Sequence, residues 1–236
     1  MSKKSSFIPN LKDRTDAGHE LGRRLLAEKI KRPIVVLGLP RGGVPVAAAV
    51  AETLGAKLDI LMVRKIGAPG HEELACGAIA SGGITVWNDE VLRSLGLTPQ
   101  DLQSTLRAEK AELVAREKLL RSAATPELSL RGHSVVLVDD GVATGATMRA
   151  AVQAVKSHLP DAIIVGLPVG PIDTCQKLER EEGAKVICVH SIPTGNFGSV
   201  GQWYTDFSQV ENQECREILR RNREDGITVD RNSALA

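Results

Sequence analysis

Residues 135–147 of the chain read Val-Val-Leu-Val-Asp-Asp-Gly-Val-Ala-Thr-Gly-Ala-Thr. The first four are aliphatic without polar alternation, which is typical of a central strand in a parallel sheet covered on both faces. Asp139 and Asp140 follow at the carboxyl end of that strand, where open α/β sheets have their ligand crevice. The turn 141–147 leads into a helical pattern over 148–158, so we expect its amides to lie at a helix N-terminus suited to an anion.

The same turn has the composition of a phosphate-binding loop. Gly141 and Gly145 let the backbone approach a ligand closely, and Thr144 and Thr147 add hydroxyl donors. Carboxylates beside a phosphate would repel it, which indicates a ligand with two ends, such as a sugar phosphate whose hydroxyls bind the acids. Because Ala146 follows the second glycine and there is no lysine, the turn is not the phosphate loop of nucleoside triphosphatases.

The bulk composition is that of an ordinary soluble globular protein. Of the 236 residues, 42% are hydrophobic and 25% are charged, and a formal net charge of +1 gives no overall attraction to nucleic acid or to an acidic membrane. The four cysteines lack the spacing of zinc sites, which predicts reduced thiols and a cytoplasmic location. The basic start is followed by Phe7-Ile-Pro rather than a long apolar run, so we expect neither a signal peptide nor a membrane anchor.

Strand and helix patterns alternate along the chain. This alternation predicts one α/β domain with a parallel sheet, which we assign to residues 1–215, followed by a fraying tail at 216–236. A helical insertion is expected at about 88–125. Buried-strand runs lie at 34–39, 58–64, 163–168 and 185–190, and helical patterns lie at 13–29, 44–54, 98–121 and 173–182.

A second anion site is predicted at residues 40–43, which read Pro-Arg-Gly-Gly between a buried strand and a helix. Arg41 can bind a di-oxyanion through two parallel hydrogen bonds, while Gly42 and Gly43 leave the neighbouring amides unobstructed. Alone, two glycines after a strand are typical of a simple turn. Together with the sugar-phosphate motif, they favour a second phosphate group at this loop.

These two segments resemble type I phosphoribosyltransferases, which bind phosphoribosyl pyrophosphate (PRPP). Residues 135–147 match the family's signature of a hydrophobic strand, two acids and Thr-Gly-x-Thr, and residues 40–43 match its pyrophosphate loop. The alternative is a strand followed by an unrelated acidic turn. The resemblance implies a parallel-sheet core with helices on both faces and a small C-terminal hood, here at about 191–210. It implies that PRPP is bound by Arg41, Gly42, Gly43, Arg64, Lys65, Asp139, Asp140, Gly141, Ala143, Thr144, Gly145, Ala146 and Thr147.

Arg64 and Lys65 precede a stretch rich in glycine and alanine at 67–83, which we interpret as a mobile loop. The pair resembles the Arg-Lys before the catalytic loop of adenine-type members, which implies that one cation reaches the pyrophosphate as the loop closes. Glu72 and Glu73 are either acids that face the acceptor base or solvated loop residues.

Four of the six aromatic residues lie between positions 197 and 207. Such a cluster is either a local core or a hood that stacks on a planar base. It resembles the hood of 6-oxopurine enzymes, which implies base contacts by Phe197, Val200 and Trp203. The resemblance also implies that Asp206 joins the two adjacent aspartates as a metal ligand.

The resemblance implies a Mg²⁺-dependent transfer of the 5-phosphoribosyl group from PRPP to a nitrogenous acceptor, with a nucleobase expected, and release of pyrophosphate. The implied catalytic residues are Asp139, Asp140, Arg41 and Lys65. Ala143 departs from the 6-oxopurine pattern, in which an aspartate at this position handles the proton of the base. The acceptor therefore does not follow from the motif.

A non-catalytic regulator of the same fold that senses PRPP or a nucleotide is the alternative. Such regulators usually carry a DNA-binding element or a broken pyrophosphate loop. The helix expected at 98–121 has charges of both signs rather than a basic face, which favours the enzyme and a small-molecule partner over nucleic acid. The family resemblance suggests a homodimer.

Overall fold

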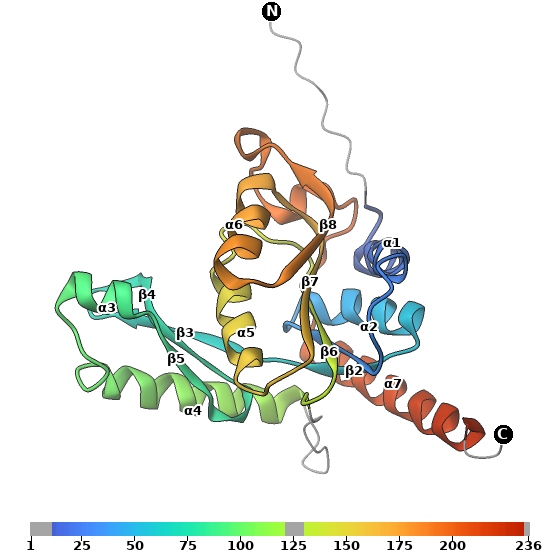
Figure 1. Cartoon of the computed structure of the whole chain (residues 1–236), viewed down its shortest axis with the longest axis horizontal. Coiled ribbons are helices and arrows are strands. Elements are labelled where there is room, and N and C mark those ends of the chain that lie inside the picture. The colour runs from blue at the N-terminus through green and yellow to red at the C-terminus, as the bar shows by residue number, and fades with distance from the viewer. Residues whose placement is uncertain (1–10, 121–129, 234–236) are drawn as a thin grey trace, which may run out of the picture.

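The computed structural model describes residues 11–120 and 130–233, without the side chains of 71–73 and 223–233. Its centre is a five-stranded sheet of order β2-β1-β6-β7-β8 in which all strands run parallel, so the predicted α/β fold is confirmed (Figure 1). The elements are α1 (Arg14–Leu26), β1 (Ile34–Gly38), α2 (Gly43–Leu54), β2 (Lys57–Ile60), β3 (Val63–Ala68), β4 (His71–Ala80), η1 (Ser81–Gly83), β5 (Thr85–Trp87), α3 (Asp89–Leu95), α4 (Gln103–Leu120), β6 (Ser134–Val138), α5 (Ala146–Lys156), β7 (Ala162–Pro171), α6 (Ile172–Glu182), β8 (Lys185–Ile192), η2 (Thr194–Asn196), η3 (Val200–Trp203) and α7 (Asn212–Ser233).

Helices cover both faces of this sheet, with α1, α2 and α7 on one side and α5 and α6 on the other (Figure 1). Successive side chains of a strand point to opposite faces. In β6, Val136 and Val138 therefore join the core beneath α1 and α2, whereas Val135 and Leu137 join the core beneath α5 and α6. Burial on both faces explains why this strand has no polar alternation.

Helix α1 lies directly against α2 because its contact face carries glycine. A Cβ at Gly18 would lie 2.5 Å from the carbonyl oxygen of Val46, and one at Gly22 would lie 2.7 Å from the Thr53 side chain. The first turn begins with Asp13, whose carboxylate accepts a hydrogen bond from the amide of Asp16 as an N-cap. Since Arg14 is the next residue, this packing fixes where its side chain leaves the helix.

Leu21 anchors α1 to the sheet and is fully buried beside Gly166 of β7. Leu21→Ala is expected to lower the free energy of unfolding by about 2–5 kcal/mol, because it removes buried methyl groups and leaves a cavity. Urea denaturation followed by circular dichroism measures the change. Leu26→Ala on the same helix is the matched control, since its side chain is 56% exposed, and it should shift stability by no more than about 0.5 kcal/mol.

The segment interpreted from the sequence as a mobile loop at 67–83 is instead part of an antiparallel sheet of order β3-β4-β5. The predicted strand at 58–64 also divides, because β2 joins the parallel sheet and β3 joins the antiparallel one. Apolar packing of Ile66 and Cys76 against Leu102 holds the hairpin to the helical layer. Short glycine and alanine side chains hid this strand pattern in the sequence.

Helices α3 and α4 lie within the predicted insertion and pack along this antiparallel sheet, forming an arm that extends from the parallel core (Figure 1). Helix α7 runs across the boundary that we drew between residues 215 and 216. Cys215 and Leu219 are both buried in the main core, so the folded domain continues past the predicted boundary. The apolar residues of this helix are few and lie among charged residues. The sequence pattern therefore did not extend the predicted domain past residue 215.

Candidate active site

The two predicted anion loops leave neighbouring strands at the same edge of the sheet. Strands β1 and β6 pair in parallel with Gly38 opposite Val138, and the amide of Leu39 donates to the carbonyl of Val138 over 2.9 Å. The Pro-Arg-Gly-Gly loop and the acid pair therefore begin side by side. This is the carboxyl edge of the sheet, where α/β folds bind ligands.

The glycines of the first loop allow the two loops to touch. A Cβ at Gly42 would lie 2.0 Å from Oδ2 of Asp140, and one at Gly43 would lie 2.7 Å from the carbonyl oxygen of Val138. Any side chain at either position would displace the acid pair or the backbone behind it. The local sequence Gly-Gly is therefore a packing requirement of the site as well as a source of open amides.

Asp139 and Asp140 are partly buried neighbours whose carboxylates have different partners. Oδ1 of Asp139 accepts the amide hydrogen of Asp140 at 2.9 Å, whereas Oδ2 of Asp140 accepts from Nε of Arg14 at 2.9 Å. Burial raises the pKa of the Asp139 carboxyl well above its usual range, and the neighbouring Asp140 charge adds to the shift. Burial also raises the pKa of Asp140, while the Arg14 guanidinium opposes the rise. The site thus concentrates negative charge in a poorly solvated place.

The raised pKa of Asp139 predicts a pH-dependent cost to stability. Its ionised form is less favourable in the folded than in the unfolded protein, so stability falls as pH rises from the usual value of 3.8 through the raised folded pKa. Asp139→Asn cannot ionise and should raise the Tm at neutral pH, by about 2–4 °C for each kcal/mol relieved, with little change at about pH 4. Calorimetry at both pH values tests this. A lower Tm for the variant at neutral pH would contradict the assignment.

The turn after the acid pair has the geometry of an anion-binding loop. Gly145 is the N-cap of α5 with a φ of +74° and no side-chain cap, so the amides of the first turn are not used by a neighbouring side chain. Thr174 of α6 fixes the turn from outside by donating to the carbonyl of Ala143 at 2.8 Å. Thr144 and Thr147 are exposed at its surface. The predicted residues therefore form a turn at 141–145 that leads into the first residues of α5, Ala146 and Thr147.

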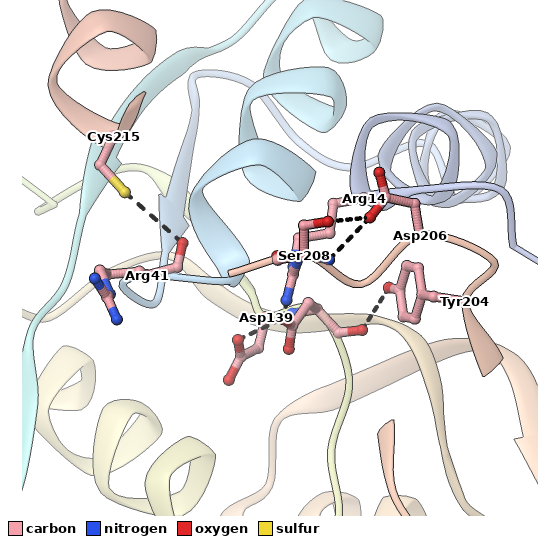
Figure 2. Close-up of polar contacts among 8 residues, drawn as sticks. Arg14, Arg41, Asp139, Tyr204, Asp206, Ser208 and Cys215 are labelled. Carbon is pink, nitrogen blue, oxygen red and sulfur yellow. Dashed lines mark hydrogen bonds and ion pairs between the residues drawn. The ribbon is translucent and has the colours of Figure 1, made fainter. Parts of the chain in front are cut away.

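Arg41 lies at the opposite side of the acid pair from Arg14 (Figure 2). Its guanidinium is 3.6 Å from Oε2 of Glu211 and 38% of its side chain is exposed. Sγ of Cys215 in α7 lies 3.9 Å from the Arg41 carbonyl oxygen. Arg41, the residue predicted to bind pyrophosphate, is thus accessible. Its surface ion pair with Glu211 is weak enough for an anion to replace it.

The structure separates the two cations that the sequence analysis paired. Arg64 makes ion pairs with Glu109 and, at 3.9 Å, with Glu112, both on α4. Lys65 is the next residue in β3 and therefore points to the other face of the hairpin. The Arg64 side chain therefore forms its ion pairs within the arm and not with the acid pair. The side chains of Glu72 and Glu73 lie outside the described residues.

The predicted hood residues divide into packing and surface groups. Trp203 is buried at 4% exposure in a small core with Leu11 and Tyr204, so its ring is not available to stack on a base. Phe197 stacks on it with ring centroids 6.3 Å apart and stays partly exposed. Val200 reaches the PRPP motif, since its Cγ1 lies 2.6 Å from the position of a Cβ at Gly141. The local-core alternative thus describes part of this cluster.

Asp206 does not join the acid pair as the sequence analysis expected. Its carboxylate accepts from the amide and the hydroxyl of Ser208, at 2.9 and 2.5 Å, and these hydrogen bonds lower its pKa (Figure 2). Within residues 11–120 and 130–233, as far as side chains are described, no group of three His, Cys, Asp or Glu side chains could hold a metal ion. Any metal at the acid pair would therefore complete its coordination with oxygen atoms of a ligand or of water.

Arg14 and Tyr204 are the two site residues that the sequence analysis missed. The Tyr204 hydroxyl donates to the backbone carbonyl of Asp140 at 2.5 Å, and Nη1 of Arg14 donates to the carbonyl of Ser208 at 2.7 Å. Both link the segment after η3 to the acid pair (Figure 2). One signal was present, because a cation in the first turn of a helix opposes the helix dipole and so indicates a partner elsewhere.

The fold and the joined loops define an α/β protein with an acid pair, an anion turn and an arginine loop at one sheet edge. A family model for the phosphoribosyl transferase domain matches residues 70–202. The chain belongs to this family and is a type I phosphoribosyltransferase relative. Within the described residues, no helix combines the length and the apolar character needed to span a membrane.

The chain is similar to proteins from Mycobacterium tuberculosis and Thermus thermophilus. The chain is 40% identical over 213 residues to two Mycobacterium tuberculosis proteins, from strains CDC 1551 and H37Rv, each named "Putative phosphoribosyl transferase". The match covers 90% of this chain and 47% of theirs, so the chain spans about half the length of these relatives. The crystal structure of TT1426 from Thermus thermophilus superposes with a TM-score of 0.81 at 38% identity, covering 89% of this chain and 98% of that one.

Proposed function

We propose that the protein transfers the 5-phosphoribosyl group of PRPP to a nitrogenous acceptor, with a nucleobase as the expected class, and releases pyrophosphate. The observation that carries the proposal is the contact between the two loops, in which Gly42 lies against the Asp140 carboxylate. Arg41 follows β1 and the acid pair follows β6, so both lie at the carboxyl edge of the sheet. One ligand with a pyrophosphate and a ribose would span both.

In the proposed reaction the bond from the anomeric carbon to pyrophosphate breaks, and pyrophosphate leaves with the electron pair. A new bond forms from the acceptor nitrogen to the same carbon, which passes through an oxocarbenium-like state. Asp139 and Asp140 would accept hydrogen bonds from the ribose hydroxyls and stabilise the positive charge. Arg41 would bind the departing pyrophosphate, and the turn 141–147 would hold the 5′-phosphate. Fixed positions of these groups lower the entropic part of the barrier.

A magnesium ion fits the chemistry of the acid pair. Mg²⁺ prefers oxygen ligands and usually takes one or two protein carboxylates together with substrate phosphates, which suits Asp139 and Asp140 without a third acid. When bound with PRPP, the ion would neutralise charge on the leaving pyrophosphate. Dependence on Mg²⁺ is part of the proposal. A cytoplasmic location is also part of it, and the four free cysteines support that location.

Ala143 supplies no carboxylate for the proton that the acceptor nitrogen loses. Its backbone carbonyl is bonded to Thr174, and the methyl side chain is exposed. A proton must therefore leave to solvent or to an acid on another segment. This favours acceptors that lose a proton without help from that position.

The test measures pyrophosphate release from PRPP and Mg²⁺ across purine, pyrimidine and pyridine bases. Turnover with one class of base is the expected result. Tight PRPP binding without turnover on any base would support the alternative, a regulator that senses PRPP or a nucleotide. If PRPP does not bind, both functions are wrong.

A further inference from the structure

Arg14 is held by three contacts at the edge of the acid pair. Its Nε is 2.9 Å from Oδ2 of Asp140, and its Nη1 donates to the carbonyl of Ser208 at 2.7 Å (Figure 2). Its guanidinium carbon also lies 3.9 Å from the centroid of the Phe207 ring. Only 11% of its side chain and 15% of the Asp140 side chain are exposed. The ion pair is therefore shielded from solvent, so loss of Arg14 would leave the Asp140 carboxylate buried without its partner.

These contacts determine which carboxylate oxygens face a ligand. Oδ2 of Asp140 is bonded to Arg14 and lies under the Gly42 backbone, and Oδ1 of Asp139 is bonded to the Asp140 amide. Among the contacts of the described residues, this leaves Oδ1 of Asp140 and Oδ2 of Asp139 for a ligand. A carboxylate free to rotate would present either oxygen, so the ion pair reduces the disorder of the ligand-binding atoms.

The same side chain joins the hood to the acid pair from a segment far away in sequence. Arg14 is separated from Asp140 by 126 positions and from Ser208 by 194. The backbone next to it pairs with the hood, since the amide of Leu11 donates to the carbonyl of Trp203 at 3.2 Å, and the amide of Thr205 donates to the carbonyl of Leu11 at 2.9 Å. The segment from Leu11 to Arg14 thus packs as part of the candidate active site.

We infer that Arg14 is a positioning residue for PRPP, which acts through Asp140 and orients the oxygen that receives the ribose or its metal ion. The inference rests on the proposed function. Arg14 itself has its donors directed to Asp140 and to the hood, and the ligand-facing atoms belong to Asp140. A residue with a purely structural role would instead stabilise the fold and affect all ligands of the site alike.

Arg14→Met tests this role with two ligands that use different parts of the site. PRPP with Mg²⁺, measured by titration calorimetry, reports on the acid pair. Inorganic phosphate, followed through the amide chemical shifts of residues 141–147, reports on that turn. We expect PRPP affinity to fall about 10–100-fold, as for other residues that orient ligating side chains, while phosphate affinity changes less than about twofold. Arg14→Lys keeps the charge and should recover part of the loss.

Arg23→Met is the matched control, because Arg23 is an exposed arginine on the same helix. It should leave both affinities unchanged. An equal loss of both ligands in Arg14→Met, or no loss of PRPP affinity, would overturn the inference. If Arg14→Met does not fold, Arg14→Lys gives the same two-ligand comparison, and binding equal to that of the unmodified protein refutes the role. Failure of the unmodified protein to bind PRPP would instead refute the proposed function.

Discussion

Replacing both Asp139 and Asp140 by asparagine is expected to lower kcat/KM for PRPP by about 10³-fold or more. In the proposed reaction, each substitution removes a negative charge that would face the developing oxocarbenium ion, and single electrostatic contacts of this kind are worth roughly 10²–10³ in rate. Asparagine also binds Mg²⁺ less well than a carboxylate. Pyrophosphate release with the best acceptor of the panel measures the effect.

Asparagine keeps the shape of both side chains, and a thermal melt of the double variant shows whether the fold survives loss of the Asp140–Arg14 ion pair. Its oxygen at position 139 can still accept the amide hydrogen of residue 140, and loss of the raised-pKa carboxyl should stabilise the fold at neutral pH. Asp161→Asn is the control, since Asp161 pairs with Lys31 at the other end of the sheet. It should retain activity within about twofold. Turnover by the double variant within tenfold of the unmodified protein would refute the role of the acid pair.

The part of the site that the sequence predicted is built from local pattern. Strand β6, the acid pair and the turn into α5 are consecutive in the sequence. The hydrophobic run, the placement of the glycines and the start of the helix therefore support the same prediction. The loop at 40–43 follows the same order of strand, glycine turn and helix. That these two loops touch follows from the parallel pairing of β1 with β6. The alternation of strands and helices predicts a parallel sheet but not which strands are neighbours in it.

The parts that the sequence did not predict depend on contacts between distant segments. The hairpin of β3 and β4 packs against α4 and α5 but has few large apolar side chains. Its sequence therefore shows little alternation of apolar and polar residues, which is the pattern that would predict a strand. Arg64 was assigned to the ligand because Arg64-Lys65 resembles the Arg-Lys pair before the catalytic loop of adenine-type members. Its partners Glu109 and Glu112 lie 45 and 48 positions later.

Arg14 illustrates the same limit at the centre of the site. Helix α1 was predicted from its apolar spacing, and nothing in that spacing identifies which distant carboxylate its first residue meets. For the aromatic cluster the sequence left a local core and a base-binding hood both open. In the structure Trp203 packs into a core with Leu11, and the neighbouring Tyr204 donates to the backbone of the acid pair. Only the three-dimensional arrangement distinguishes packing aromatics from those at the site.

Gly42→Ala should also lower activity strongly, although it changes no functional group. The new Cβ would lie 2.0 Å from Oδ2 and 2.7 Å from Cγ of Asp140, so that carboxylate must move. It cannot move freely, since Arg14 holds the same oxygen. A misplacement of about 1 Å can lower a rate by roughly 10²-fold, so we expect at least that loss in kcat/KM for PRPP.

Gly195→Ala is the matched control for this glycine substitution. Gly195 lies in η2 of the hood and a Cβ there would have nothing within 4 Å, so its activity should change less than about twofold. Pyrophosphate release measures both variants, and a chemical-shift titration with inorganic phosphate checks that the turn 141–147 is intact. Full activity in Gly42→Ala would mean that the two loops separate in solution. The contact that carries the proposed function would then not exist in the working protein.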